Sequence, residues 1–128
     1  MPDYLDTSAF IKLVRSEPES VALRRALAGR ELLSSALLVV EARRAARRYG
    51  EIASRRARVG LSTITLLPLD RPVLDAAADL NPAELRSLDA LHLATALSIG
   101  EDLAYFYCYD IRLADAARAV GIDVAQPR

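Results

Sequence analysis

The sequence predicts an α/β fold: a single three-layer domain with a parallel sheet of four to five strands flanked by helices. Short apolar segments alternate along the chain with longer segments whose apolar residues recur at helical spacing. Apolar residues make up 52% of the chain, which is enough to build a core and argues against disorder. No repeat, low-complexity segment or linker divides the sequence, so we expect residues 1–128 to form one domain.

The expected elements follow from these patterns. The expected strands are Tyr4–Leu5, Glu31–Ser34, Thr63–Leu67 and Leu103–Tyr109, with a short edge strand near Val124. The expected helices are Thr7–Arg15, Pro18–Gly29, Ala36–Gly50, Glu51–Val59, Pro72–Leu80, Ser87–Ile99 and Ile111–Val120.

Start and stop signals justify the helices of the first half. Phe10 and Val14 recur at helical spacing in the first helix. Pro18 suits the first turn of the second helix, and Ser35 is a good N-cap for the third. Gly50 then ends the third helix and separates it from the helix that is expected to pair with it as a hairpin.

The second half follows the same logic. Thr63–Leu67 is β-branched and apolar, as expected of a strand. Pro72 opens the next helix, and the Asn-Pro pair at 81–82 breaks it. The pattern is strongest over Ser87–Ile99, where Gly100 supplies the stop.

Composition excludes several classes of protein. The formal net charge is zero, which argues against a generic coat for polyanions. Cys108 is the only cysteine, so neither an internal disulfide nor a thiolate metal site is expected. No apolar run reaches the ~18 residues of a membrane span, and the N-terminus lacks a signal-peptide pattern. We therefore expect a cytoplasmic protein without membrane contact.

The basic residues are unevenly placed. Sixteen of the seventeen are arginine, and seven of these lie within residues 43–58. This stretch could be a solvated helix face. It could also be a basic margin that holds an RNA backbone or an acidic partner peptide, because guanidinium groups bind phosphate and carboxylate in a bidentate way.

Four acidic residues, Asp6, Glu41, Asp89 and Asp110, follow predicted strands or lie within two turns of the next helix. The carboxyl ends of parallel strands meet at one edge of a sheet, where ligands bind. Gathered carboxylates raise each other's pKa, and a hard divalent cation relieves that repulsion. The pattern therefore predicts metal-assisted chemistry on a phosphate.

Each acid also has a simpler interpretation. Asp6 and Asp110 could cap the helices that follow them, and an acid in a first turn is favoured by the helix dipole. Glu41 follows four apolar residues and needs a partner, for which Arg44 or Arg86 is the simple candidate. Four independent caps are nevertheless a less economical explanation than one shared site.

Four segments resemble a PIN domain of the VapC toxin type, and the resemblance runs from Asp3 to Pro127. The segments are LDTSAFIKL, SALLVVEARRA, RSLDALHLATAL and YFYCYDIRLADAARAVGI. The resemblance implies a strand order 3-2-1-4-5 and a Mg²⁺- or Mn²⁺-dependent endoribonuclease that is the toxin of a type II toxin–antitoxin pair.

By position, the resemblance implies that Asp6, Glu41, Asp89 and Asp110 are the catalytic and metal-binding residues. Asp6 and Asp89 would be the principal ligands, and the other two would bind the metal directly or orient water. A metal-bound water would attack the phosphorus in line.

Four further residues are expected to support the site. Ser8 matches the small polar residue that supports the first acid in the family. Cys108 stands where the family commonly has Thr or Ser; it is a poorer hydrogen-bond donor and is expected to be a buried strand residue rather than a nucleophile. Arg86 could pair with the acids or clamp a phosphate. His92 could act on a proton, contact RNA, or be a hydrogen-bonded core group.

The implied partners are an RNA substrate, a cognate antitoxin and a second copy of the chain. The antitoxin peptide could bind a groove formed by the helices within Glu17–Ala28 and Ala36–Val59. A PIN-like module that binds RNA or protein but cuts weakly or not at all is the alternative. A receiver domain would need a lysine after its last strand, whereas Lys12 is the only lysine, and a haloacid-dehalogenase phosphatase would need Asp-x-Asp after strand one.

Overall fold

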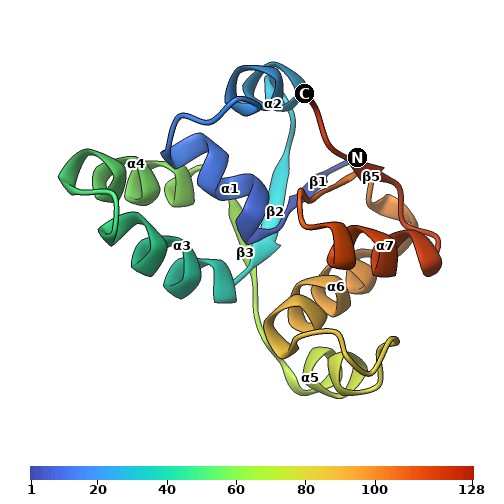
Figure 1. Ribbon diagram of the computed structural model, residues 1–128. Helices are drawn as coiled ribbons and strands as arrows, with labels where there is room; N and C mark the ends of the chain where they lie inside the picture. The colour runs from blue at the N-terminus through green and yellow to red at the C-terminus, as the bar shows by residue number, and fades with distance from the viewer.

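The computed structural model describes residues 1–128 and confirms both the fold class and the strand order. Its sheet has five parallel strands in the order β3-β2-β1-β4-β5, with helices on both sides (Figure 1). The strands are β1 (Asp3–Leu5), β2 (Leu32–Ser35), β3 (Thr65–Leu67), β4 (Phe106–Tyr107) and β5 (Val124–Ala125).

The helices fall close to their expected positions. They are α1 (Thr7–Val14), α2 (Ser20–Leu27), α3 (Leu37–Arg47), α4 (Glu51–Ser62), α5 (Arg71–Ala78), α6 (Ser87–Ile99) and α7 (Ile111–Ala119), with a 3₁₀ turn η1 (Gly100–Asp102) after α6. Helix α6 matches its expected bounds, and α4 extends one turn further than expected, which shortens the strand that follows it. None of these helices combines the length and the apolar character that crossing a bilayer requires.

Successive residues of the central strands pack against opposite helix layers. Tyr4 of β1 and Phe106 of β4 are fully buried with side chains of α6 and α7, whereas Leu5 and Tyr107 pack with α1 and α2. This is the two-residue periodicity of a strand, and it gives the sheet a core on each face. A third apolar cluster joins α1 to α3 and α4 around Phe10.

Two expectations about local structure need correction. The expected strand Leu103–Tyr109 is a strand only at Phe106–Tyr107, because its neighbours offer few partners: Tyr4 and Leu5 on one side and the two residues of β5 on the other. Ser35 is the last residue of β2 rather than the N-cap residue of α3. Its hydroxyl still accepts the N–H of Leu37, at 3.1 Å, so the capping chemistry is retained one residue earlier.

The strand order places a crevice beside β1. The chain runs from β1 outward to β2 and β3, and then crosses back so that β4 pairs with the other side of β1. Ligands bind at such a switch in strand order, outside the carboxyl ends of the strands. Helices α1 and α7 begin at this edge, directly after β1 and shortly after β4.

Candidate active site

The four acids predicted from the sequence lie at the starts of four helices. Asp6 and Asp110 are the N-cap residues of α1 and α7, and their side chains accept the N–H groups of Ala9 and Leu113 at 2.9 Å. The simpler capping interpretation is therefore correct for both. Asp89 lies in the first turn of α6, and Glu41 lies in the second turn of α3. Capping does not compete with a role at a site, because a carboxylate has two oxygens and several lone pairs.

Asp6 is the most buried of these acids, with 3% of its surface exposed. Its partners are neutral: Ser8 Oγ lies 2.7 Å and 2.9 Å from its two oxygens, and the N–H of Ala9 completes the set. Burial raises the pKa of Asp6 above its ordinary value, although these hydrogen bonds act in the opposite direction. The fold therefore holds a carboxyl group away from water without giving it a salt bridge.

Glu41 belongs to a hydrogen-bonded network that crosses the core. His92 Nε2 lies 2.7 Å from Glu41 Oε1, and Tyr4 Oη lies 2.8 Å from His92 Nδ1. Thr7 Oγ1 donates to the same Glu41 oxygen at 2.7 Å and lies 3.0 Å from His92 Nε2. Tyr4 and His92 are almost fully buried, so the network links the core of the sheet to its carboxyl edge.

The direction of these hydrogen bonds follows from the chemistry of the partners. A carboxylate only accepts, so His92 Nε2–H donates to Glu41. Burial raises the pKa of Tyr4, which keeps the phenol protonated as a donor to His92 Nδ1. Partial burial alone would raise the pKa of Glu41, but the hydrogen bonds from His92 and Thr7 outweigh it and hold that pKa below its usual value.

The expected partner of Glu41 was wrong. Neither Arg44 nor Arg86 forms a salt bridge with it; the partner is His92, from a helix on the other side of the sheet. Arg86 acts on Glu41 only at a distance, through its positive charge. The His92 interpretation as a hydrogen-bonded core group is confirmed, and the structure adds that its acceptor is one of the four acids.

Arg86 bridges the other two acids. Its Nε donates to Asp89 Oδ2 at 3.0 Å, and its Nη2 lies 3.4 Å from Asp110 Oδ2. The two carboxylates raise the pKa of the guanidinium, which stays charged. Its side chain is 70% exposed, so the bridge spans the entrance of the site rather than its floor. Of the two roles that the sequence left open, the structure shows pairing with the acids.

Ser8 and Cys108 connect Asp6 to the segment that carries Asp110. Ser8 Oγ also accepts the N–H of Tyr109 at 2.9 Å, so one hydroxyl ties the end of β1 to the chain beyond β4. Cys108 is fully buried just after β4, and its thiol lies 3.4 Å from the backbone oxygen of Asp110. Burial raises the pKa of this thiol, which keeps it protonated and unsuited to nucleophilic chemistry.

The four acids share one edge of the sheet but do not converge on a single point as the side chains stand. No three Asp, Glu, His or Cys side chains lie close enough together to hold a metal ion. The physical reason is visible in the contacts: Arg86 occupies the oxygens of Asp89 and Asp110, while Glu41 faces His92. A hollow of about 370 Å³ opens beside Asp110, the only one of the four acids that lines it; the other lining residues are Thr7, Ser8, Ile11, Lys12, Glu17 and Tyr109.

Sequence reasoning missed Thr7 and the hydrogen bond of Tyr4. Thr7 follows Asp6 directly, and its position in the first turn of α1 aims its hydroxyl at α3. Tyr4 was expected only as a residue of the first strand. The available signal was His92 itself: a lone histidine inside an apolar helix needs a polar partner, and polar side chains on the central strand are the nearest candidates.

Solved structures share the fold. The crystal structure of VapC20 from Mycobacterium tuberculosis, a toxin that cleaves the sarcin-ricin loop, superposes with a TM-score of 0.74 over 97% of this chain and 98% of that one, at 19% identity. VapBC2 from Rickettsia felis, bound to a promoter DNA fragment, gives a TM-score of 0.75 over 100% of both chains at 12% identity. A toxin–antitoxin complex from Klebsiella pneumoniae gives 0.71 over 98% of both chains at 21% identity.

Sequence relatives are more similar still. Ribonuclease VapC46 of Mycobacterium tuberculosis (strain H37Rv) is 49% identical over 125 residues, which covers 97% of this chain and 96% of the relative. Ribonuclease VapC47 of the same species (strain CDC 1551) is 44% identical over 130 residues with the same coverage of each chain. The family model of the PIN domain matches residues 4–119. With this span and these relatives, the chain belongs to the PIN-domain family.

Proposed function

We propose that this protein is an endoribonuclease of the VapC type, that it hydrolyses RNA phosphodiester bonds with Mg²⁺ or Mn²⁺, and that it is the toxin of a toxin–antitoxin pair. The relatives that span the whole chain are named ribonucleases, and they supply the reaction class. The arrangement of Asp6, Glu41, Asp89 and Asp110 at one edge of the sheet supplies the chemistry.

The single observation that carries the proposal is the environment of Asp6. A protein that needed only a cap at this position would be more stable with Ser or Asn, because burying a carboxyl group is unfavourable unless it is paired. Here the carboxyl is buried, its pKa is raised, and its donors are neutral. Such a group is typical of a functional site rather than of a structural one.

The chemistry of the four carboxylates suits a hard divalent cation, although no three of them lie close enough together to hold one as the side chains stand. Carboxylate oxygen is the ligand that Mg²⁺ and Mn²⁺ prefer, and four carboxylates against one bridging arginine leave an excess of negative charge at this edge. Asp6 and Asp89 would be the principal ligands, with Glu41 and Asp110 binding the ion or orienting water. When bound, the ion would activate water and neutralise charge on the phosphate.

The remaining residues would position these groups. His92 and Thr7 hold one oxygen of Glu41, which leaves its second oxygen available. Ser8 fixes Asp6 relative to the segment that carries Asp110. Arg86, exposed at the entrance, is the one cation that could leave the acids and contact an entering phosphate.

The partner assignment is also part of the proposal. Two of the solved structures with this fold are VapBC or toxin–antitoxin complexes, which supports an antitoxin as the natural inhibitor of this chain. Exposed apolar side chains such as Val21, Ile52 and Ile111 would supply contacts to that partner or to a second copy. Size-exclusion chromatography with light scattering, with and without the co-expressed antitoxin, tests both.

The experiment that tests the reaction uses the purified protein and a panel of labelled RNAs, the sarcin-ricin loop among them, with Mg²⁺, with Mn²⁺ and with a chelator. We expect cleavage that the chelator abolishes and that either metal restores. Binding of Mn²⁺, followed by calorimetry, should disappear in Asp6→Ala and persist in Asp75→Ala, which removes an exposed acid whose partner is Arg71. RNA cleavage that continues undiminished in chelator would exclude the metal mechanism.

A further inference from the structure

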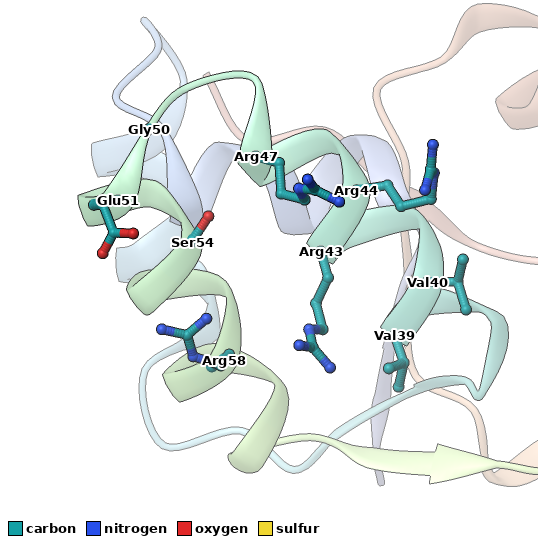
Figure 2. Close-up of a pocket in the computed structure, with 9 residues that line it drawn as sticks. All are labelled: Val39, Val40, Arg43, Arg44, Arg47, Gly50, Glu51, Ser54 and Arg58. Atoms are coloured by element: carbon teal, nitrogen blue, oxygen red, sulfur yellow. The ribbon is translucent and has the colours of Figure 1, made fainter.

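A second polar groove lies between α3 and α4, on the side of the molecule away from α5 and α7 (Figure 1). Its volume is about 640 Å³, and four arginines line it: Arg43, Arg44 and Arg47 from α3, and Arg58 from α4. Figure 2 shows the Arg43 side chain in the space between the two helices, while the Arg58 side chain lies over α4. We call this the arginine groove.

The positive charge of the arginine groove is not neutralised within the protein. All four arginines are exposed, and none takes part in a salt bridge. The lining contains one acid, Glu51. Arg43 and Arg47 are four residues apart on one helix, a spacing at which like charges destabilise the helix. A groove built in this way is suited to an anionic ligand.

The lining favours a phosphate backbone over a helical peptide. An amphipathic helix needs an apolar stripe to receive its anchors, but the only apolar side chains here are Val39 and Val40. Guanidinium groups bind phosphate oxygens in a bidentate way, and the hydroxyl of Ser54 adds a further donor. The expectation of a peptide groove in these helices is therefore not favoured at this position.

The arginine groove also adjoins the candidate active site. Val40 lines the groove and directly precedes Glu41, and Arg44 lies three residues after Glu41, on the same side of α3. A strand that lay in the groove would continue along α3 to the carboxylates.

From these observations we propose that the arginine groove binds the phosphate backbone of the RNA strand that the protein cuts, beside the scissile bond. The inference rests on the proposed ribonuclease function for the identity of the strand. Independently of that function, Arg43, Arg47 and Arg58 would determine the affinity for RNA without taking part in the chemical step.

The test compares two triple variants with equal loss of charge. The first is Arg43→Gln, Arg47→Gln, Arg58→Gln. The matched control is Arg48→Gln, Arg55→Gln, Arg56→Gln, which removes three exposed arginines from the same two helices but outside the groove. Binding of a labelled single-stranded RNA of about twelve nucleotides is followed by fluorescence anisotropy in chelator, so that affinity is measured without cleavage.

We expect the groove variant to bind RNA at least about tenfold more weakly than the control, and its plot of log affinity against log salt to be shallower by about 2, since each phosphate contact on a single strand contributes about 0.7 to that slope. In cleavage assays its KM should rise while kcat stays within about twofold. Both triples should keep the wild-type circular dichroism, because all six side chains are exposed and unpaired.

Equal RNA affinity and equal salt slopes for the two triples would overturn the proposal. So would a groove variant that keeps RNA affinity but loses binding to a poly-glutamate peptide, because that result assigns the groove to an acidic protein. Failure of the groove assignment can be told apart from failure of the proposed ribonuclease function. Wild-type protein that binds RNA through the groove but never cuts it would remove the ribonuclease function and leave the groove assignment standing.

Discussion

The two ends of strand β1 hold buried aspartates in opposite ways. Asp3 at the amino end is fully buried, and Arg30 binds both of its oxygens, at 2.7 Å and 3.0 Å, while the N–H of Tyr105 adds a third donor at 3.2 Å. Asp6 at the carboxyl end is equally inaccessible but has only neutral donors. The same residue type, three positions apart, is therefore charge-compensated at one edge of the sheet and uncompensated at the other.

This difference is the one expected between a structural acid and the functional acid that we propose Asp6 to be. A bidentate arginine satisfies Asp3 within the fold, so nothing remains for a ligand to supply. Asp6 keeps an unfavourable desolvation that a cation would relieve.

The largest effect is expected from Asp6→Asn on RNA cleavage. Asn keeps the oxygen that caps α1 but removes the negative charge, so the folded protein should lose activity by about 1,000-fold or more, which corresponds to about 4 kcal/mol of barrier. Initial rates at saturating Mn²⁺ measure it, with Asp75→Asn as the exposed control. Wild-type rates from a folded Asp6→Asn protein would contradict the functional assignment of this residue.

The second effect concerns the opposite edge. Arg30→Ala leaves the carboxylate of Asp3 buried without a cation, and we expect the free energy of unfolding to fall by clearly more than in the control. Urea denaturation measures the loss, and Arg25→Ala, an exposed arginine at the end of α2, is the control. Cleavage per folded molecule should not change. A stability loss no larger than that of the control would show that Asp3 is not structural.

The third prediction concerns the network behind Glu41. Tyr4→Phe removes the donor to His92 Nδ1, which loosens the imidazole that orients Glu41. If Glu41 binds the metal as proposed, we expect kcat to fall about tenfold with KM unchanged, because residues that orient metal ligands commonly contribute about that much to activity. The free energy of unfolding should fall by about 1–2 kcal/mol.

The control for this network is Tyr105→Phe, because the Tyr105 side chain is partly exposed and makes no hydrogen bond to the site. A Tyr4→Phe protein that loses stability but keeps kcat would give the network a purely structural role.

The smallest effect is on the stability of Asp6→Asn. Most substitutions of buried residues destabilise a protein, but this one should stabilise it. Because the folded-state pKa of Asp6 is raised, the wild-type protein loses stability as the pH rises from the ordinary value of 3.8 towards that raised pKa, and the loss persists above it. Asn does not ionise, so the variant should melt a few degrees higher than wild type near pH 7.

Thermal melts at several pH values check this. The difference in melting temperature between Asp6→Asn and wild type should become smaller as the pH falls towards 3.8, because Asp6 then becomes protonated in both the folded and the unfolded protein. Asp3→Asn should instead lower the melting temperature near pH 7, because it breaks the ion pair with Arg30. If both substitutions shift the melting temperature in the same direction, the contrast between the two ends of β1 is false.

The amino-acid pattern predicted the fold class, the helices at whose starts the four acids lie and, through the family resemblance, the strand order. The fold class and the helices depend on local periodicity and on capping residues, which neighbouring positions encode. Helix α6 could be bounded to the residue, since its apolar pattern and Gly100 leave one solution. Short strands were less predictable, because the length of a strand depends on the partners that the sheet supplies.

The partner of each polar side chain depended on how the chain folds in three dimensions. Tyr4 and His92 lie 88 positions apart, and Thr7 and Glu41 lie 34 apart, so no local pattern relates them. The sequence left open whether Arg86 pairs with the acids or binds a phosphate, and the fold places it between Asp89 and Asp110. Hydrogen bonds and ion pairs act over a few ångströms, and the packing of the helices on the sheet sets those distances.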